Sequence, residues 1–553
     1  MSKWNKPAPP SAAKPVQLGP VIPTAKPSGR GKWLLLLLVV AAAGAVFWFK
    51  LPGQATAVTE NVEPLIERAA KSLADGQPSD ALQDLSEAIR RAPRNARSFM
   101  LRGDARLASG DRTGAIEDYD TAIKLDHGLA EAWGKRGAAR AAGGETNEAL
   151  ANLNKAVELD PQNATLFVLR GDFQRTQNGM AAAIGDYSRA VALRSDDPAI
   201  HEKLADAQSA VGDWATAIAA YDHALALKPD DTRLLDKRGS AKASAGDMTG
   251  AIADFSGAIA LDKNDAELRY HRGVALASSG DHVAAIADFS EAIRLKPDVA
   301  RYYGKRGDAQ MDVGERGAAI SDYTTALRLD PGDAATYNNR GNARKANGDV
   351  AGAIADYTES IRLRPGHANT FFNRAAARRA KGDLTGAIFD YSRAAQLAPT
   401  DAECYLQRGI ARQANNDAAG AIADFNLAIR MNPKDIYAYC RRGDVRVASG
   451  DPAGAITDYN QAIAIKPDDP YAHCGRAEAK SAAGDFSGAI ADFDQAIRLK
   501  PDYALAHLQR GKAKAADGDR TGAADDYRWV IDHCTDSQLV ELATSLLKKV
   551  NKP

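Results

Sequence analysis

A 34-residue internal period is the feature that most constrains how this chain folds. The dipeptide Arg-Gly or Arg-Ala recurs every 34 residues, or every 68 where one copy is skipped, from Arg102 to Arg510. Units that start at Val62 follow one another without insertion or deletion and give fourteen copies over residues 62–537. Such a period is typical of arrays in which each unit packs on its neighbours. Repeat positions are counted below from the first residue of each unit.

Each unit has the pattern of two helices separated by a short turn. The first helix is expected to end at Gly-Asp, as in Gly110-Asp111, because glycine adopts the left-handed conformation and aspartate caps the next helix. The second is expected to end near proline, as at Pro161 and Pro365, because proline cannot continue a helix. Small residues at positions 8 and 20 and a large residue at position 24 allow the two helices to pack closely. The sequence therefore predicts an all-α protein.

This pattern resembles the tetratricopeptide repeat. The matching residues in one unit are Trp133, Gly137, Ala149, Leu153 and Pro161. The resemblance implies a right-handed α-solenoid of about fourteen 34-residue helix-turn-helix repeats, whose first helices line a concave groove that binds protein or extended peptide partners. Residues 538–553 follow the last unit with apolar side chains on one helical face, and we expect a C-terminal capping helix and tail there.

The chain departs from the usual repeat at positions 7 and 23. Arg stands at position 7 in thirteen units and Asp at position 23 in twelve, and both are lost together in one unit, which has Leu204 and Ala220. This joint loss predicts an ion pair between the two helices of one unit. Pairing with the next unit instead would leave Asp186 and Arg238 unpaired. The predicted pairs include Arg306 with Asp322, Arg340 with Asp356, and Arg442 with Asp458.

Four Arg-Gly-Asp triplets begin at Arg102, Arg170, Arg306 and Arg442. The triplet resembles an adhesion signal read by integrin-type receptors. Each one, however, falls at positions 7 to 9 of a predicted helix. We expect its Arg and Gly to serve packing, with only its third residue facing the groove.

The candidate binding residues lie at groove positions of the first helices. Residues 334–401 place amides and cations there, which suit the backbone and acidic side chains of an extended segment: Asn338, Asn342, Lys345, Asn369, Asn373 and Arg379. Tyr437 and Tyr471 share position 2 in adjacent units and form a candidate stacking ladder. A polysaccharide is an alternative ligand for this groove, and ordinary solvated side chains are the other interpretation.

Several kinds of chemistry are not indicated. The chain lacks the nucleotide-binding, metalloprotease and hydrolase motifs that bring reactive groups together, so we expect no enzyme and no cofactor. Its four cysteines form no Cys-x-x-Cys pair, and we expect no metal site. Beyond residue 50 the chain has a small excess of acidic residues, whereas nucleic-acid binding requires clustered positive charge.

The N-terminal region has the pattern of a membrane anchor. Residues 1–32 are basic and proline-rich, and we expect them to be disordered. Residues 33–49 carry no charge and predict a transmembrane helix of about 25 Å, and residues 50–61 form a linker. Because the flanking positive charge lies on the N-terminal side, we expect a cytoplasmic N-terminus and a periplasmic array at a bacterial inner membrane. The alternatives are cleavage after Ala57, as in a signal peptide, and an inverted anchor with a cytoplasmic array.

The function predicted from these features is a membrane-anchored, non-enzymatic scaffold that binds protein partners in its groove. The alternative is a component of cell-envelope polysaccharide synthesis or export that contacts glycan or its synthase.

Overall fold

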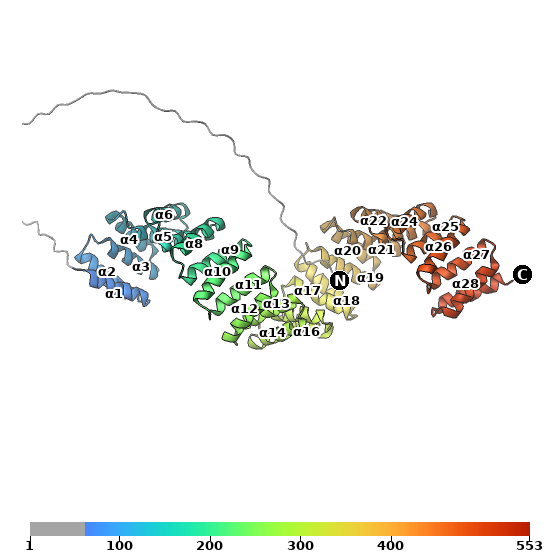
Figure 1. Cartoon of the computed structure of the whole chain (residues 1–553), viewed down its shortest axis with the longest axis horizontal. Coiled ribbons are helices and arrows are strands. Elements are labelled where there is room, and N and C mark those ends of the chain that lie inside the picture. The colour runs from blue at the N-terminus through green and yellow to red at the C-terminus, as the bar shows by residue number, and fades with distance from the viewer. Residues whose placement is uncertain (1–60, 553) are drawn as a thin grey trace, which may run out of the picture. The chain divides into compact units, whose positions relative to one another are not determined.

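The computed structural model describes residues 61–552, which form 29 helices and no strand (Figure 1). The array begins as a compact unit at Val62, the first residue of the first predicted repeat. Each repeat contributes two helices, and in ten of the fourteen units the second helix ends two residues before a proline. The predicted tail at 1–32, the predicted membrane span at 33–49 and residues 50–60 of the predicted linker lie outside the described residues.

The odd-numbered helices are the first helices of the repeats and the final capping helix. They are α1 (Glu63–Ala74), α3 (Ala96–Ala108), α5 (Ala130–Ala141), α7 (Ala164–Thr176), α9 (Pro198–Ala210), α11 (Thr232–Ser244), α13 (Ala266–Ser279), α15 (Ala300–Asp312), α17 (Ala334–Ala346), α19 (Ala368–Ala380), α21 (Ala402–Ala414), α23 (Ile436–Ala448), α25 (Pro470–Ala482), α27 (Ala504–Ala516) and α29 (Ser537–Val550).

The even-numbered helices are the second helices of the repeats. They are α2 (Pro78–Arg91), α4 (Arg112–Leu125), α6 (Thr146–Leu159), α8 (Met180–Leu193), α10 (Trp214–Leu227), α12 (Met248–Leu261), α14 (His282–Leu295), α16 (Arg316–Leu329), α18 (Val350–Leu363), α20 (Leu384–Leu397), α22 (Ala418–Met431), α24 (Pro452–Ile465), α26 (Phe486–Leu499) and α28 (Arg520–His533).

The turn between the two helices of a unit follows the sequence prediction. Gly110 has a φ of +86°, and the side chain of Asp111 accepts a hydrogen bond from the Gly114 amide at 2.9 Å. Two units use asparagine in place of glycine, and Asn178 and Asn416 have φ values of +59° and +61°. Asparagine is the residue that best tolerates this conformation after glycine, so the same turn is kept in every unit.

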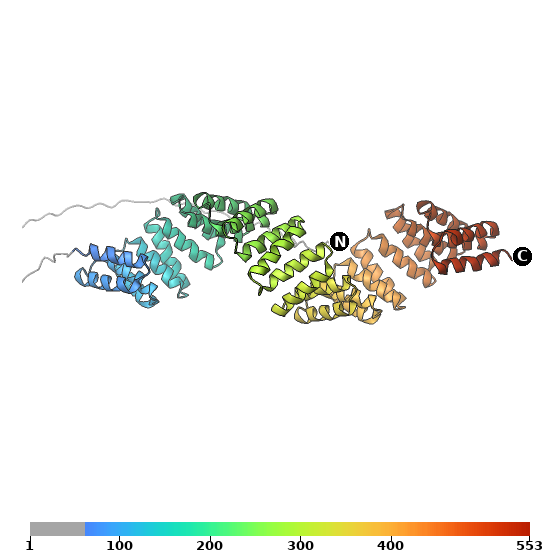
Figure 2. The same cartoon turned by 90° about the horizontal axis from the view of Figure 1, so that it is seen from below.

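Each unit contacts mainly its neighbours, as the consecutive helix pairs in Figures 1 and 2 illustrate. Contacts that skip a helix join odd-numbered helices, such as α1 with α3, α5 with α7, and α23 with α25. Because first helices approach one another across the unit boundaries, they line the inner surface of the array. This surface carries the predicted groove positions.

The core consists of small clusters that repeat along the chain. In one unit, Ala115 and Tyr119 are fully buried, and a Cβ atom on Gly103 would lie 2.6 Å from the Tyr119 ring. The aromatic ring at position 24 therefore requires a small residue at position 8, which is glycine here and alanine beside Tyr221, Tyr391 and Phe493. At the C-terminus, α29 packs Leu539 and Leu546 against the last repeat, in the manner of a capping helix.

Within residues 61–552, no helix combines the length and apolar character needed to cross a membrane.

Candidate functional site

The arginine at position 7 lies against the aspartate at position 23 of its own unit. Arg306 donates from Nε and Nη2 to the two carboxylate oxygens of Asp322, at 2.7 and 2.8 Å. Arg340 contacts Asp356 in the same bidentate way, at 3.0 and 2.7 Å, and Arg442 does so with Asp458. The carboxylates are buried, with 6% exposure at Asp322, so each is satisfied by a planar guanidinium rather than by water.

The same guanidinium makes a third bond that the sequence reading missed. Arg306 Nη1 donates to Ser290 Oγ at 3.0 Å, and Ser290 is at position 25 of the preceding unit. Eleven arginines make this bond, and their acceptors are Asp120, Asn154, Asp222, Ser256, Ser290, Thr324, Thr358, Ser392, Asn426, Asn460 and Asp494. The arginine therefore joins two units as well as two helices.

A sequence signal for this bond exists. Position 25 carries Ser, Thr, Asn or Asp in thirteen units, and it carries Arg528 in the last unit, which no further repeat follows. The arginine often also lies over the aromatic ring at position 4, as Arg136 lies 4.5 Å from the centre of the Trp133 ring. The predicted pairs thus join the helices and units of the array and are not free to bind a partner.

The aspartates of the Arg-Gly-Asp triplets also have partners inside the array. In all four triplets the third residue accepts a hydrogen bond from the tyrosine at position 24, as Asp104 does from Tyr119 at 2.8 Å and Asp308 from Tyr323 at 2.8 Å. The expectation that this residue only faces the groove is incomplete, because it also fixes the tyrosine hydroxyl.

The candidate residues of α17 and α19 are brought together in part. Asn373 Nδ2 donates to Asn338 Oδ1 at 3.2 Å, which links adjacent units on the inner surface. Asn342 accepts from the Tyr357 hydroxyl at 2.8 Å, so this amide is committed to the same interaction as the triplet aspartates. Asn338 also lines a small cavity of about 130 Å³.

The three other candidates in this region differ in exposure. Asn369 is exposed, whereas Lys345 and Arg379 are half-buried. Burial lowers the pKa of Lys345, because the ammonium loses hydration without a compensating anion. The 130 Å³ cavity is lined by Asn338 and by none of the other five candidates.

A larger cavity lies farther along the inner surface, between α23, α25 and α27. Its volume is about 480 Å³. Most of its lining residues stand at positions 1, 2, 5, 6 and 9 of the first helices: Ile436, Tyr437, Cys440, Arg441, Asp444, Tyr471, Cys474, Gly475, Glu478 and Leu505. The other lining residues are Tyr459, Asp469 and Tyr503. Its walls combine aromatic rings with polar groups, a composition typical of ligand pockets.

Tyr437 and Tyr471 stand at this cavity with exposed fractions of 42% and 55%. The predicted ladder is arranged differently, because Tyr471 makes its ring contact with Tyr503, edge to face at 5.2 Å. The Arg441 guanidinium lies 4.7 Å from the centre of the Tyr437 ring, and Lys500 Nζ lies 5.2 Å from the centres of both Tyr471 and Tyr503. These rings therefore already interact with cations.

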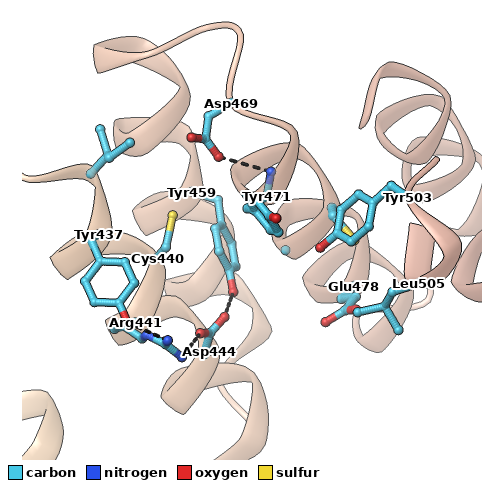
Figure 3. Close-up of a pocket in the computed structure, with 13 residues that line it drawn as sticks. Tyr437, Cys440, Arg441, Asp444, Tyr459, Asp469, Tyr471, Glu478, Tyr503 and Leu505 are labelled. Atoms are coloured by element: carbon cyan, nitrogen blue, oxygen red, sulfur yellow. Dashed lines mark hydrogen bonds and ion pairs between the residues drawn. The ribbon is translucent and has the colours of Figure 1, made fainter. Parts of the chain in front are cut away.

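The lower side of the cavity carries the carboxyl groups of Asp444 and Glu478, with Tyr471 and Tyr503 above them (Figure 3). Burial, followed by the charge of Asp444, raises the pKa of Glu478 above its usual value. Burial also raises the pKa of the Cys440 and Cys474 thiols to about 12, so both remain protonated at neutral pH. The cavity therefore offers negative charge and aromatic surface, and no reactive thiolate.

The comparisons with known proteins identify the class. A family model described as "Tetratricopeptide repeat" matches residues 72–130, 134–198, 202–266, 237–300, 305–368 and 338–402, which together cover more than half of the chain. A second model, described as "TPR repeat", matches residues 443–484 and 481–518. The chain belongs to the tetratricopeptide repeat family.

Several solved structures match parts of the chain. A tetratricopeptide repeat protein from Parabacteroides merdae is 21% identical, and the match covers 46% of this chain and 99% of that protein with a TM-score of 0.38. MamA is 26% identical over 31% of this chain and 93% of its own, with a TM-score of 0.30. YrrB, described as a TPR protein with an unusual peptide-binding site, is 18% identical over 33% and 95%, with a TM-score of 0.31. No curated protein matches.

Proposed function

We propose that this chain is a non-enzymatic scaffold that holds extended segments of protein partners along the inner surface of its array. The observation that carries the proposal is the 480 Å³ cavity between α23 and α27, which is lined by first-helix positions of three successive units. Two of its tyrosines are about half exposed in the free protein, so a bound segment would bury aromatic surface there.

A photo-crosslinking experiment tests this proposal. A photoreactive amino acid replaces Tyr437 in the cavity or, as a control, Val283, which is 71% exposed on the second helix α14. The proposal predicts protein adducts from position 437 that are absent from position 283. Adducts from position 283 alone would refute the assignment of the inner surface. Glycan adducts from position 437 would instead support the role in polysaccharide synthesis or export.

The proposal includes attachment to a membrane through residues 33–49, with the N-terminus in the cytoplasm and the array in the periplasm. Its support is the uncharged sequence of this segment and the positive charge that precedes it. The test fuses a reporter enzyme that is active only outside the cytoplasm to the C-terminus. Activity in the membrane fraction is the expected result. Reporter activity confined to a soluble fraction would indicate cleavage, and an inactive reporter would indicate the inverted orientation.

A further inference from the structure

At the cavity between α23 and α27, one unit lacks a side chain that the equivalent units have. In five units the residue at position 9 is aspartate, and the residue at position 6 of the next unit stands 31 residues farther along the chain. Four of these next units supply a hydrogen-bond donor to the aspartate, and they do so with Lys135, Lys203, Lys237 and Asn339. At the fifth aspartate, Asp444, the corresponding residue is Gly475, and it is the only glycine at position 6 in the fourteen units.

The aspartates at position 9 of the other units show which chemical group can occupy the space beside the carboxylate. Lys203 Nζ lies 2.8 Å from a carboxylate oxygen of Asp172, and Lys237 Nζ lies 2.6 Å from one of Asp206. An ammonium group is compact and carries three donors, so it satisfies a carboxylate in this position while its methylene chain crosses the unit boundary. Three of the four filled sites contain this group.

Asp444 retains two interactions, and both leave the cavity side of the carboxylate open. It accepts a hydrogen bond from the Tyr459 hydroxyl at 2.6 Å, and Arg441 Nη1 lies 3.6 Å from its other oxygen. Arg441 also donates to the Tyr437 hydroxyl and lies over that ring. The Asp444 side chain is 42% exposed, and the four filled aspartates range from 23% at Asp104 to 39% at Asp206.

A second carboxylate and aromatic rings complete the site. Glu478 is half-buried, and its hydrogen bond comes from the neutral amide of Gln509 at 3.3 Å. Tyr471 and Tyr503 line the same cavity (Figure 3). Their contact with Lys500 shows that these rings can pair with an ammonium group. The chain itself cannot fill the space from position 475, because a Cβ atom there would lie 2.3 Å from the Tyr459 ring.

We infer that this cavity binds the ammonium group of a lysine side chain from an extended segment of a partner protein, held between Asp444 and Glu478. The inference rests on the proposed function, since it assumes that partner segments occupy the inner surface. The guest lysine takes the place that Lys203 and Lys237 hold at the equivalent aspartates. Its methylene groups pack against Tyr471, and its charge lies between two carboxylates, beside Arg441 at Asp444 and in addition to the charge of Lys512 at Glu478.

Peptide binding to the full-length protein tests the inference. The probes are fluorescein-labelled nonapeptides with random flanking residues, which differ only in a central lysine, acetyl-lysine, norleucine or glutamate. Fluorescence anisotropy is expected to show about tenfold tighter binding of the lysine peptides than of the other three, the effect of one charge-assisted hydrogen bond.

Three variants locate the effect. Asp444→Asn and Glu478→Gln are each expected to weaken the lysine peptides about tenfold and to leave the norleucine peptides unchanged. Asp444→Asn is compatible with the fold, because Asn342 occupies the same repeat position and accepts the same tyrosine bond. The matched control is Asp172→Asn, at the same position in a unit where Lys203 already fills the site, and it is expected to bind all peptides as the unchanged protein does.

The outcomes separate the two proposals. Peptide binding without a preference for lysine, or a preference that survives Asp444→Asn, would overturn the lysine site and leave the groove function standing. Tighter binding of the glutamate peptides would overturn the site as well. If the unchanged protein bound none of the four peptides, both the lysine site and the use of this surface for extended segments would be refuted.

Discussion

The pair between Arg306 and Asp322 offers the most direct test of how a unit is held together. The perturbations are Arg306→Leu, Asp322→Ala and the double replacement. This unit is chosen because its position 11 is the neutral Gln310, whereas in many other units a second cation reaches the aspartate, as Arg344 reaches Asp356 at 2.8 Å. The chain contains a precedent for the double replacement in Leu204 and Ala220, which are both buried.

The magnitude follows from the geometry. Two charge-assisted bonds of 2.7 and 2.8 Å join the side chains, and Asp322 is only 6% exposed. Removing one partner of a buried pair costs about 3–5 kcal/mol, because the other charge is left without compensation. The Arg306 side chain is 21% exposed and regains some hydration, so we expect about 2–4 kcal/mol for each single replacement. The double replacement is expected to cost about as much as one single replacement, which corresponds to a coupling of about 2–4 kcal/mol.

Hydrogen exchange measured by mass spectrometry is the suitable assay, because long repeat arrays do not unfold in one cooperative step. A local loss of about 2 kcal/mol accelerates exchange in α15 and α16 about 30-fold in each single variant. Peptides from α23 and α24 serve as the internal control and are expected to exchange at unchanged rates. If the acceleration in the double variant equals the product of the two single effects, the side chains act independently and the reasoning is refuted.

Three other changes test separate features. Gly341→Ala places a Cβ atom 2.7 Å from the Tyr357 ring, and we expect a loss of about 1–3 kcal/mol in local stability by the same exchange assay; an unchanged rate would show that the ring can move. A hydrogen bond to Asp236 raises the pKa of His271. The contribution of this pair to the stability of the fold is therefore fully present below about pH 6.5 and is lost as the pH rises through the folded-state pKa. His271→Gln is therefore expected to accelerate exchange in α11 and α13 at pH 6 more than at pH 8, and an equal effect at both pH values would contradict this. Tyr391→Phe removes a buried hydroxyl that has no hydrogen-bond partner, and the exchange assay is expected to show no loss of local stability in α20; a loss above about 1 kcal/mol would reveal a partner for that hydroxyl.

Tyr323→Phe is the matched control for the last change. The Tyr323 hydroxyl donates to Asp308 at 2.8 Å, so its removal is expected to cost about 1–3 kcal/mol, since a half-buried carboxylate loses one of its donors.

Much of the fold could be predicted from the sequence because fourteen copies serve as an internal alignment. The period fixed the helix pairs, the Gly-Asp turn fixed their boundary, and the joint change at Leu204 and Ala220 indicated which side chains face each other. Each of these inferences compares positions within one unit, where helix geometry relates spacing directly to proximity.

Contacts between units were harder to predict. The bond from Arg306 to Ser290 spans a unit boundary, and its geometry depends on the angle at which successive helix pairs stack. Asn342 occupies a groove position, but the sequence does not reveal that the Tyr357 hydroxyl reaches it. The cavity could not be predicted from functional groups alone, because the feature that indicates it is the absence of a side chain at Gly475.

The arginine that bonds across the boundary has a consequence for how such a chain evolves. Thirteen of the fourteen repeats carry a donor at position 7, and thirteen carry an acceptor at position 25, so any repeat that has both can follow any other. Gain or loss of 34 residues in frame at any point between Arg238 and Arg510 leaves every donor with an acceptor in front of it. Tandem duplication can thus lengthen the array without compensating mutations. In the last unit, Arg528 stands in the place of the acceptor.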